Sequence, residues 1–310
     1  MRTTIANRFT DSLTSIQRHA RQMADEQVRL SAGVKLLRAS DSPLTLGKSI
    51  DLRTTEAQLG ALGRLQSAAA SRMSESESAL RDAGKVLDDL YQLYAMTRNA
   101  GIGKQQLIGL SSQAVVLQEE LKQILQRADA TGYRIFNTTA LKVIIDGGTA
   151  GVDTVKINTV GSLKELQMLN PGAEIDWTES DRESLDAAVN ELVYGEGSFL
   201  KDFVDRLSEG DAEGLRVPPP DEPDPLTVLK KASEEMVLQQ ISLGAAQSRV
   251  DRSVQRTEDL KVSVKTSLSN EIDTDFAAST MEVQKARALL DAAQSITAQI
   301  GSMNLFQKLG

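Results

Sequence analysis

Apolar and polar positions alternate in a regular pattern between residues 59 and 97. Core-type positions recur at intervals of three and four residues over more than five heptads, at Leu59, Leu62, Gln66, Ala69, Met73, Ser76, Leu80, Ala83, Leu87, Leu90, Tyr94 and Thr97. This spacing predicts a helix that packs along its whole length. Such a helix would be about 57 Å long at 1.5 Å per residue, which indicates a rod.

Two further segments carry the same spacing. The first follows a turn predicted at Gly101 and Gly103, and its seam is Leu107, Leu110, Ala114, Leu117, Leu121, Ile124 and Ala128. The second seam is weaker and consists of Leu229, Ala232, Met236, Leu243, Ala246, Val250, Leu260, Val264 and Leu268, with Gln239, Ser253 and Thr257 in core register. We expect the first segment to fold back on the long helix.

Each end of the chain carries one narrow apolar stripe. The N-terminal stripe is Ile5, Phe9, Leu13, Ile16, Ala20, Met23 and Leu30, and the C-terminal stripe is Ala286, Leu289, Ala293, Ile296, Ile300 and Met303, with Leu305 and Phe306 just beyond it. Neither segment 1–36 nor segment 272–310 has enough apolar area to fold alone. The stripes either become ordered against partner molecules or dock on the central bundle of the same chain. Within the chain, the candidate seam sets Ile5, Leu13 and Ile16 against Ile296, Ile300 and Met303.

The middle of the chain has a different pattern. Short β-branched runs bounded by glycines predict a hairpin of two strands, Leu141–Asp146 and Thr154–Val160. Helical patterns follow at Asp181–Tyr194 and Ser198–Leu207, and the proline-rich stretch Arg216–Pro225 is typical of a semi-rigid linker.

The predicted fold is therefore mainly α, an elongated coiled-coil or helical bundle built from both chain ends, with a small α+β insertion in the middle. We expect an N-terminal helix of an axial core in 1–40, the first part of a helical bundle in 41–139, an inserted α+β module in 140–217, the second part of the bundle in 218–270, and a C-terminal helix of the axial core in 271–310.

Composition narrows the possible functions. The net charge of −8 argues against nucleic acid or an anionic membrane as the main partner. The chain has no Cys and only 4 % aromatic residues, which suits thin helical seams better than a compact globule. No apolar run is long enough for a membrane span, and the first 16 residues lack the apolar core of a signal peptide.

Candidate chemistry is sparse, so we expect no catalytic, cofactor-binding or metal-binding residues. His19 is the single histidine and has no second metal ligand in register. The acids Asp221, Glu222 and Asp224 are interleaved with prolines, which favours a solvated linker over a calcium loop.

Two other features are given structural interpretations. Asp273 and Asp275 are candidates to cap the last helix. Trp177 is expected in a small core of the middle module.

The two ends resemble the flagellin family. The resemblance rests on Met1–Ile5, Arg29–Gly33, Ala39–Pro43, Asn270–Ala277 and Ser302–Leu309. Pro43, preceded by Asp41 and Ser42, is closer to the hook–filament junction branch than to filament subunits. The stretch Gly132–Asn137 has features of both branches, and the match covers about the first 140 and the last 90 residues.

This resemblance implies a non-enzymatic structural subunit that joins hook to filament. It also implies self-assembly into a ring or tube, contact with hook-associated protein 1 and flagellin, and an export chaperone. The location would be the extracellular flagellum, reached by type III export without a cleaved signal peptide. The alternatives are a filament subunit and, more distantly, a cytoplasmic coiled-coil adaptor.

Overall fold

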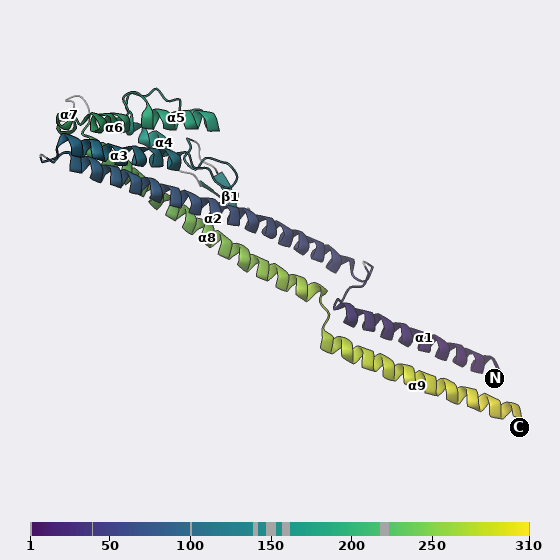
Figure 1. The fold of residues 1–310 in the computed structure, drawn as a ribbon. Coiled ribbons are helices and arrows are strands. Elements are labelled where there is room, and N and C mark those ends of the chain that lie inside the picture. Colours follow the sequence, from purple (N-terminus) through teal and green to yellow (C-terminus); the bar gives the residue numbers. More distant parts are fainter. Residues whose placement is uncertain are drawn as a thin grey trace. The chain divides into compact units, whose positions relative to one another are not determined.

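The computed structural model describes residues 2–38, 40–99, 101–138, 142–146, 153–156, 162–217 and 223–309, with side chains described from residue 10 to residue 299 apart from those that border the gaps. Its elements in chain order are α1 (Arg2–Ala32), α2 (Pro43–Thr97), α3 (Lys104–Leu125), β1 (Lys142–Asp146), β2 (Asp153–Lys156), α4 (Ser162–Glu165), the 3₁₀ helix η1 (Leu166–Leu169), α5 (Arg182–Tyr194), α6 (Phe199–Glu209), α7 (Ala212–Arg216), α8 (Pro225–Ile272) and α9 (Phe276–Leu309). The prediction of a mainly helical chain with a small α+β middle is confirmed (Figure 1).

The chain divides into two compact units. Unit 1 consists of residues 1–60 and 258–310, and unit 2 of residues 61–257. The two divisions fall inside α2 and α8, so each of these long helices contributes to both units.

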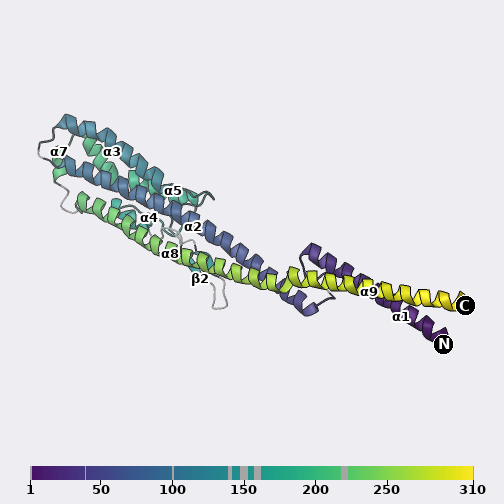
Figure 2. The ribbon, with the colours of Figure 1, turned by 90° about the horizontal axis from the view of Figure 1, so that it is seen from below.

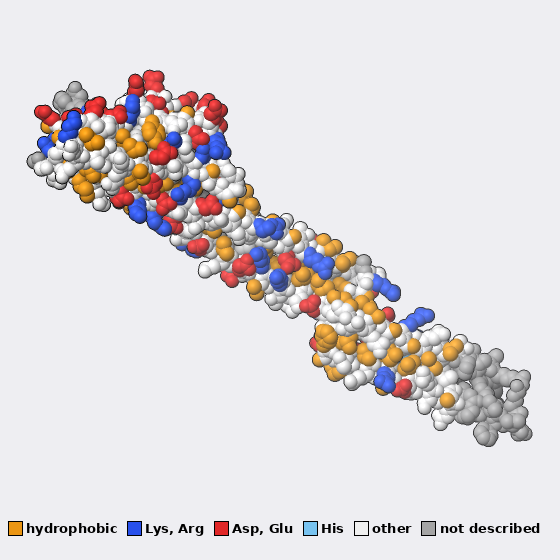
Figure 3. Space-filling view, viewed as in Figure 1, with side chains coloured by type: hydrophobic (Ala, Val, Ile, Leu, Met, Phe, Trp, Pro, Cys, Tyr) orange, Lys and Arg blue, Asp and Glu red, His pale blue; other side chains and the backbone are white. Residues whose placement is uncertain are grey.

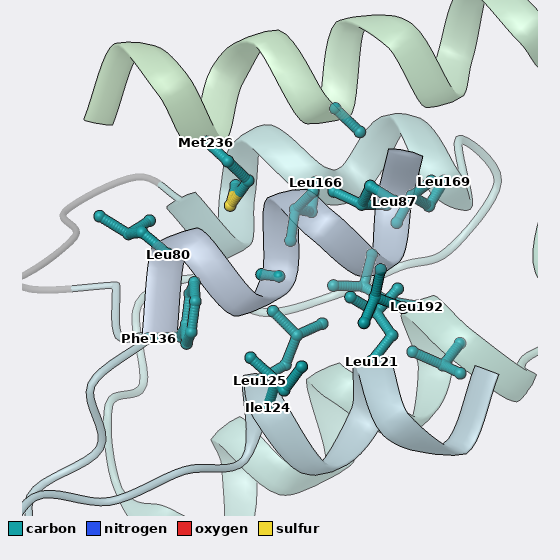
Figure 4. Close-up of a cluster of buried hydrophobic side chains, with 14 of the residues drawn as sticks. Leu80, Leu87, Leu121, Ile124, Leu125, Phe136, Leu166, Leu169, Leu192 and Met236 are labelled. Atoms are coloured by element: carbon teal, nitrogen blue, oxygen red, sulfur yellow. The ribbon is translucent and has the colours of Figure 1, made fainter. Parts of the chain in front are cut away.

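Unit 2 has one hydrophobic core, which is organised around α2. Figure 4 shows α2 between α8, which contributes Met236, and α3, which contributes Leu121, Ile124 and Leu125. All the predicted core positions of α2 from Gln66 to Thr97 are buried, as the heptad spacing requires. The seam predicted for α3 is confirmed as well, because its members are buried or partly buried.

Smaller elements cover this core. Asp181 accepts hydrogen bonds from the amides of Glu183 and Ser184, which begins α5, and Gly210 ends α6 in the left-handed conformation at φ 70°. The rings of Phe199 and Phe203 lie 5.5 and 5.0 Å from the ring of Tyr94.

Two buried or partly buried aromatic groups also have hydrogen-bond partners. The Tyr94 hydroxyl donates to the carbonyl of Leu215, and burial raises the pKa of this phenol. Trp177 is partly buried against the core and donates to Gln167 Oε1 at 2.8 Å, as expected for a small core with one large side chain.

The predicted hairpin forms in the described residues, with β1 antiparallel to β2 and a bulge between Ile144 and Asp146. Ile145 and Val155 point into the core, and Ile144 is exposed. Residues 141 and 157–160 of the predicted strands, and residues 218–222 of the predicted linker, lie outside the described part of the chain.

A polar cluster lies inside this core. Gln66 Nε2 donates to the carbonyl of Ile145 and to the hydroxyls of Ser253 and Thr257 at 2.9 to 3.0 Å. The spacing predicts that Gln66, Ser253 and Thr257 occupy core register. The structure adds that Gln66 and Ser253 both donate to the carbonyl of Ile145, at the base of the hairpin. The cluster fixes the register of α2, α8 and β1, because each buried polar group would lose its partners after a shift of one residue.

Candidate assembly surface

Unit 1 pairs the two ends of the chain. Helices α1 and α9 lie side by side in antiparallel orientation (Figures 1 and 2). The hydroxyls of Ser12 and Thr297 are hydrogen-bonded at 2.6 Å near one end of the pair, and Val34 forms an antiparallel bridge with Asp273 at the other. Small side chains on α9, such as Ala286 and Ala293, let the two helices approach closely.

One face of each helix is packed in this pair. On α1 the partly buried positions include Ser12, Ile16, His19, Met23, Glu26 and Leu30, which are again spaced by three and four. On α9 the packed positions are Val283, Ala286, Leu290, Ala293 and Thr297. His19 also contacts Gln22 Oε1 through Nδ1 at 3.1 Å, which agrees with a structural role.

The predicted assembly residues therefore fall into three groups. Ile16, Met23, Leu30 and Ala293 lie on the packed faces. Leu13, Leu289 and Ile296 are instead exposed, by 44, 43 and 54 %. The side chains of Ile5, Phe9, Ile300, Met303, Leu305 and Phe306 lie outside the described part of the structure.

The exposed group corrects the seam that we expected within the chain. The expected seam includes Leu13 and Ile296, but neither side chain is packed. On α9 the packed face includes Leu290 and Thr297 in place of Leu289 and Ile296 of the predicted stripe. These are the next positions along α9, but Ala286 and Ala293 belong to both faces, so the packed face is rotated by only about 50° from the predicted one. Leu260 of α8, another predicted seam residue, is likewise exposed.

Large apolar side chains are exposed on both helices of the α1–α9 pair. We call Leu13, Val28, Met281, Leu289 and Ile296 the outer row. On the one face of the molecule that Figure 3 shows, charged side chains are frequent on unit 2 and sparse on the described parts of α1 and α9. Apolar side chains on a paired helix with few charges nearby are typical of a surface that another protein covers.

The breaks between helices in unit 1 are tied to each other by backbone hydrogen bonds. The amide of Lys35 donates to the carbonyl of Ile272 at 2.7 Å, and the amide of Thr274 donates to the carbonyl of Gly33 at 3.0 Å. We call residues 33–35 and 272–274 the clasp. Thr274 is buried, so exchange of its hydrogen bond for water requires the clasp to open.

Side chains support the clasp on both sides. Lys48 of α2 forms an ion pair with Glu271 of α8, and the Lys35 ammonium donates to the carbonyl of Asn270 at 2.7 Å. Asp275 caps α9 as predicted, since its Oδ1 accepts from the amides of Ala277 and Ala278. Asp273 does not act as a cap and accepts a hydrogen bond from the hydroxyl of Ser269 instead.

The clasp was not predicted from the sequence. The available signals were Gly33, a residue suited to a helix C-terminus, and the break at residues 273–275. Neither signal indicates that the two breaks contact each other. Gly33 and Ile272 are 239 positions apart in the sequence, and only the folded chain brings them together.

The described residues contain no group of three or more His, Cys, Asp or Glu side chains placed to hold a metal ion. Over the same part of the chain, no helix has an apolar stretch long enough to cross a bilayer. Asp224 of the predicted acidic linker forms an ion pair with Arg98 at 3.0 Å, whereas Asp221 and Glu222 lie outside the described part of the chain.

Two family models match the chain over more than half of its length. The bacterial flagellin N-terminal helical region matches residues 7–140, and the bacterial flagellin C-terminal helical region matches residues 226–309. The chain belongs to the flagellin family. The match includes α1 from residue 7 onward and all of α2, α3 and α9, so it covers the clasp and the outer row.

Individual relatives agree with this flagellin-family assignment. Polar flagellin A of Vibrio parahaemolyticus is 21 % identical over 93 % of this chain and 94 % of that protein. A solved structure from Vibrio parahaemolyticus, described as a flagellar hook-associated protein, matches 75 % of this chain and all of that one, with a TM-score of 0.52. The two sequences are 13 % identical, so this match shows a likeness of fold. This flagellin-family chain is thus a structural component of the bacterial flagellum, and proteins of its family assemble with their own copies.

Proposed function

We propose that this chain is a filament subunit of the flagellum, a flagellin, and that the outer row is the surface through which its paired ends meet neighbouring copies. The observation that carries the proposal is the exposure of Leu13, Leu289 and Ile296 beside a closely packed helix pair. The likeness to polar flagellin A over nearly the whole of both chains supports it.

The mechanism is mechanical. Unit 2 folds around its own core, whereas α1 and α9 bury only one narrow face each within the chain. Neighbouring copies supply the missing apolar contacts. The entropy cost of ordering the two ends is therefore offset mainly when the subunit assembles with other copies. We expect the apolar residues Ile5, Phe9, Ile300, Met303, Leu305 and Phe306 to take part in the same contacts between copies. In this proposal the chain reaches the flagellum by type III export, with a chaperone.

A hook–filament junction subunit is the second candidate. Pro43 favours it, because the junction branch of the family carries a proline at this point, and the fold is like that of the Vibrio parahaemolyticus protein described as hook-associated. In that case the partners are hook-associated protein 1 on one side and flagellin on the other, and copies of this chain form a small ring.

Seeded assembly tests the proposal. Purified chain is added to short fragments of its own sheared filaments, and growth is followed by electron microscopy. Long filaments are expected. Growth that stops at small oligomers, together with a deletion strain that makes bare hooks and sheds flagellin, would favour the junction subunit. A chain that never enters surface appendages would overturn both candidates.

A matched pair of substitutions on α9 tests the outer row. Ile296→Asp puts a charge into the row and is expected to slow seeded growth at least about tenfold. Ser295→Asp adds the same charge at an exposed polar position next to it and is expected to leave growth close to wild type. Equal growth rates of the two variants would mean that the outer row is not an assembly surface.

A further inference from the structure

A pocket lies in unit 2 where α6 and α7 pack against the end of α2 (Figure 1). Its volume is about 480 Å³, which is within the range of sites that bind small organic molecules. All the residues that line it belong to unit 2, so none of them is part of the clasp or the outer row, which belong to unit 1.

Aromatic and other apolar side chains make up much of the pocket lining. The rings of Phe199 and Phe203 are parallel to within 9°, with their centroids 6.0 Å apart, and both rings lie against Tyr94. Met168 of η1 and Val228 of α8 add to this lining. Because Phe199 and Met168 are only partly buried, the pocket offers an apolar group of a ligand a place out of water.

One cation in the lining is already neutralised within the chain. Arg206 Nε donates to Asp202 Oδ2 at 2.7 Å, and Arg206 Nη1 donates to the carbonyl of Gly214 at 2.8 Å. These bonds hold the guanidinium in place and offset its charge. Arg206 and Asp202 together therefore favour neither an anionic nor a cationic ligand.

Two other charged side chains in the lining, those of Lys201 and Asp205, are available to a ligand. They are four residues apart on α6, a spacing at which opposite charges can pair. Among the described residues, however, neither side chain forms an ion pair or a hydrogen bond. The pocket thus presents one positive group and one negative group without internal partners in that part of the chain.

The start of α6 adds hydrogen-bond donors close to Lys201. Ser198 is the N-cap residue, but its hydroxyl donates to the carbonyls of Leu192 and Val193 and accepts no hydrogen bond from the helix. The first amides of α6, at residues 199–201, therefore have no side-chain cap at the positive end of the helix. Together with the Lys201 ammonium, they favour a carboxylate at this end of the pocket.

A buried amide oxygen next to the pocket requires a donor instead. Asn170 is fully buried, and its Nδ2 donates to the carbonyl of Glu191 at 2.8 Å, whereas its Oδ1 has no partner among the described residues. A Cβ on Gly197 would lie 3.4 Å from this oxygen, and Gly197 lines the pocket together with Pro171 and Gly172. An N–H group of a ligand would satisfy this oxygen, which is costly to leave unpaired.

We propose that this pocket binds an α-amino acid with an apolar side chain. The carboxylate is bound by Lys201 and the first amides of α6, the ammonium is offered the Asp205 carboxylate and the unpaired Asn170 oxygen, and the side chain lies against Phe199 and Phe203. A zwitterion fits because it brings one charge of each sign, whereas a simple anion leaves Asp205 without a partner and a simple cation leaves Lys201 without one. The inference goes beyond the proposed function and does not depend on it.

Three related probes test the two charges of the ligand separately. L-Phenylalanine is titrated into the full-length chain and followed by NMR through the amides of Gly172, Gly197 and Phe199. It is expected to bind with a dissociation constant on the order of 1 mM, as its small size allows. 3-Phenylpropanoate lacks the ammonium and phenethylamine lacks the carboxylate, so each is expected to bind at least about fivefold more weakly.

Matched substitutions assign each charge of the ligand to its residue. Lys201→Met should bind L-phenylalanine and phenethylamine about equally, because the partner of the carboxylate is gone. Asp205→Asn should likewise no longer distinguish L-phenylalanine from 3-phenylpropanoate. Lys230→Met and Asp251→Asn make the same changes at exposed positions of α8 outside the pocket lining, and both should bind all three probes as wild type does.

Each outcome decides the proposal. Wild-type chain that binds no L-phenylalanine well above the expected constant, or that binds the three probes equally, overturns it. Pocket variants that keep the wild-type preference among the probes, or controls that lose it equally, overturn it as well. Seeded growth is measured separately, so failure of amino-acid binding leaves the proposed function standing, and failure of seeded growth leaves the pocket standing.

Discussion

Replacement of Gly33 by Ala tests whether the two ends of the chain are coupled. Gly33 follows the last residue of α1 at φ 70°, and its carbonyl accepts the amide of Thr274. A Cβ at this position would meet no atom within 4 Å, so the substitution acts through backbone conformation alone. An L-residue in the left-handed region costs about 1 to 2 kcal/mol, and the stiffer unfolded chain of Ala returns part of this, which leaves a net loss of about 1 kcal/mol.

The loss should appear on both sides of the clasp. We expect the amides of Lys35 and Thr274 to exchange with deuterium about fivefold faster in Gly33→Ala than in wild type, since 1 kcal/mol corresponds to that factor in an opening equilibrium. Native-state exchange followed by NMR measures the two amides separately. Faster exchange at Lys35 with unchanged exchange at Thr274 would refute the coupling, because it would show that the end of α1 opens alone.

Gly47→Ala is the matched control for this measurement. Gly47 lies in α2 within unit 1, and a Cβ there also meets no atom within 4 Å. Its backbone is helical, so Ala should stabilise α2 by about 0.8 to 1 kcal/mol, and exchange at Lys35 and Thr274 should not rise. Both substitutions replace Gly with Ala, but Gly33→Ala is expected to destabilise the folded chain and Gly47→Ala to stabilise it.

Three further predictions concern unit 2. Gln66→Leu removes three buried hydrogen bonds and should lower the free energy of unfolding by about 2 to 3 kcal/mol in a urea titration; an unchanged midpoint would mean that the polar cluster adds no stability. Leu87 is fully buried, so Leu87→Ala leaves a cavity in the core and should lower the free energy of unfolding by about 3 to 5 kcal/mol. Leu65 is half exposed, so Leu65→Ala should change it by less than about 1 kcal/mol, and equal losses would contradict the packing described. Burial raises the pKa of Asp129, but hydrogen bonds from Thr131 and Tyr133 and the charge of Arg72 outweigh it and hold the pKa below its usual range. Its stabilisation is therefore present above about pH 4 and lost as pH falls through the lowered folded value, so Asp129→Ala should show a smaller drop in stability between pH 5 and pH 2 than wild type in the same titration.

The sequence by itself determined the helices of the bundle and their core-facing sides. In α2 the spacing placed even Gln66, Ser76 and Thr97 correctly in the core. A sustained heptad repeat has only one face that can stay in contact with the neighbouring helices along the whole length of the helix. It also located the hairpin and the cap at Asp275.

Tertiary structure alone decided which face of α9 is packed. Ala, Leu and Ile surround much of this helix, so two faces one residue apart both satisfy the three-four spacing. The choice of Leu290 and Thr297 over Leu289 and Ile296 depends on α1, which supplies the hydroxyl of Ser12 at that level. The clasp and the carbonyl partner of Gln66 could not be predicted from local sequence patterns either. Hydrogen bonds between segments far apart in sequence depend on where the whole folded chain brings those segments together.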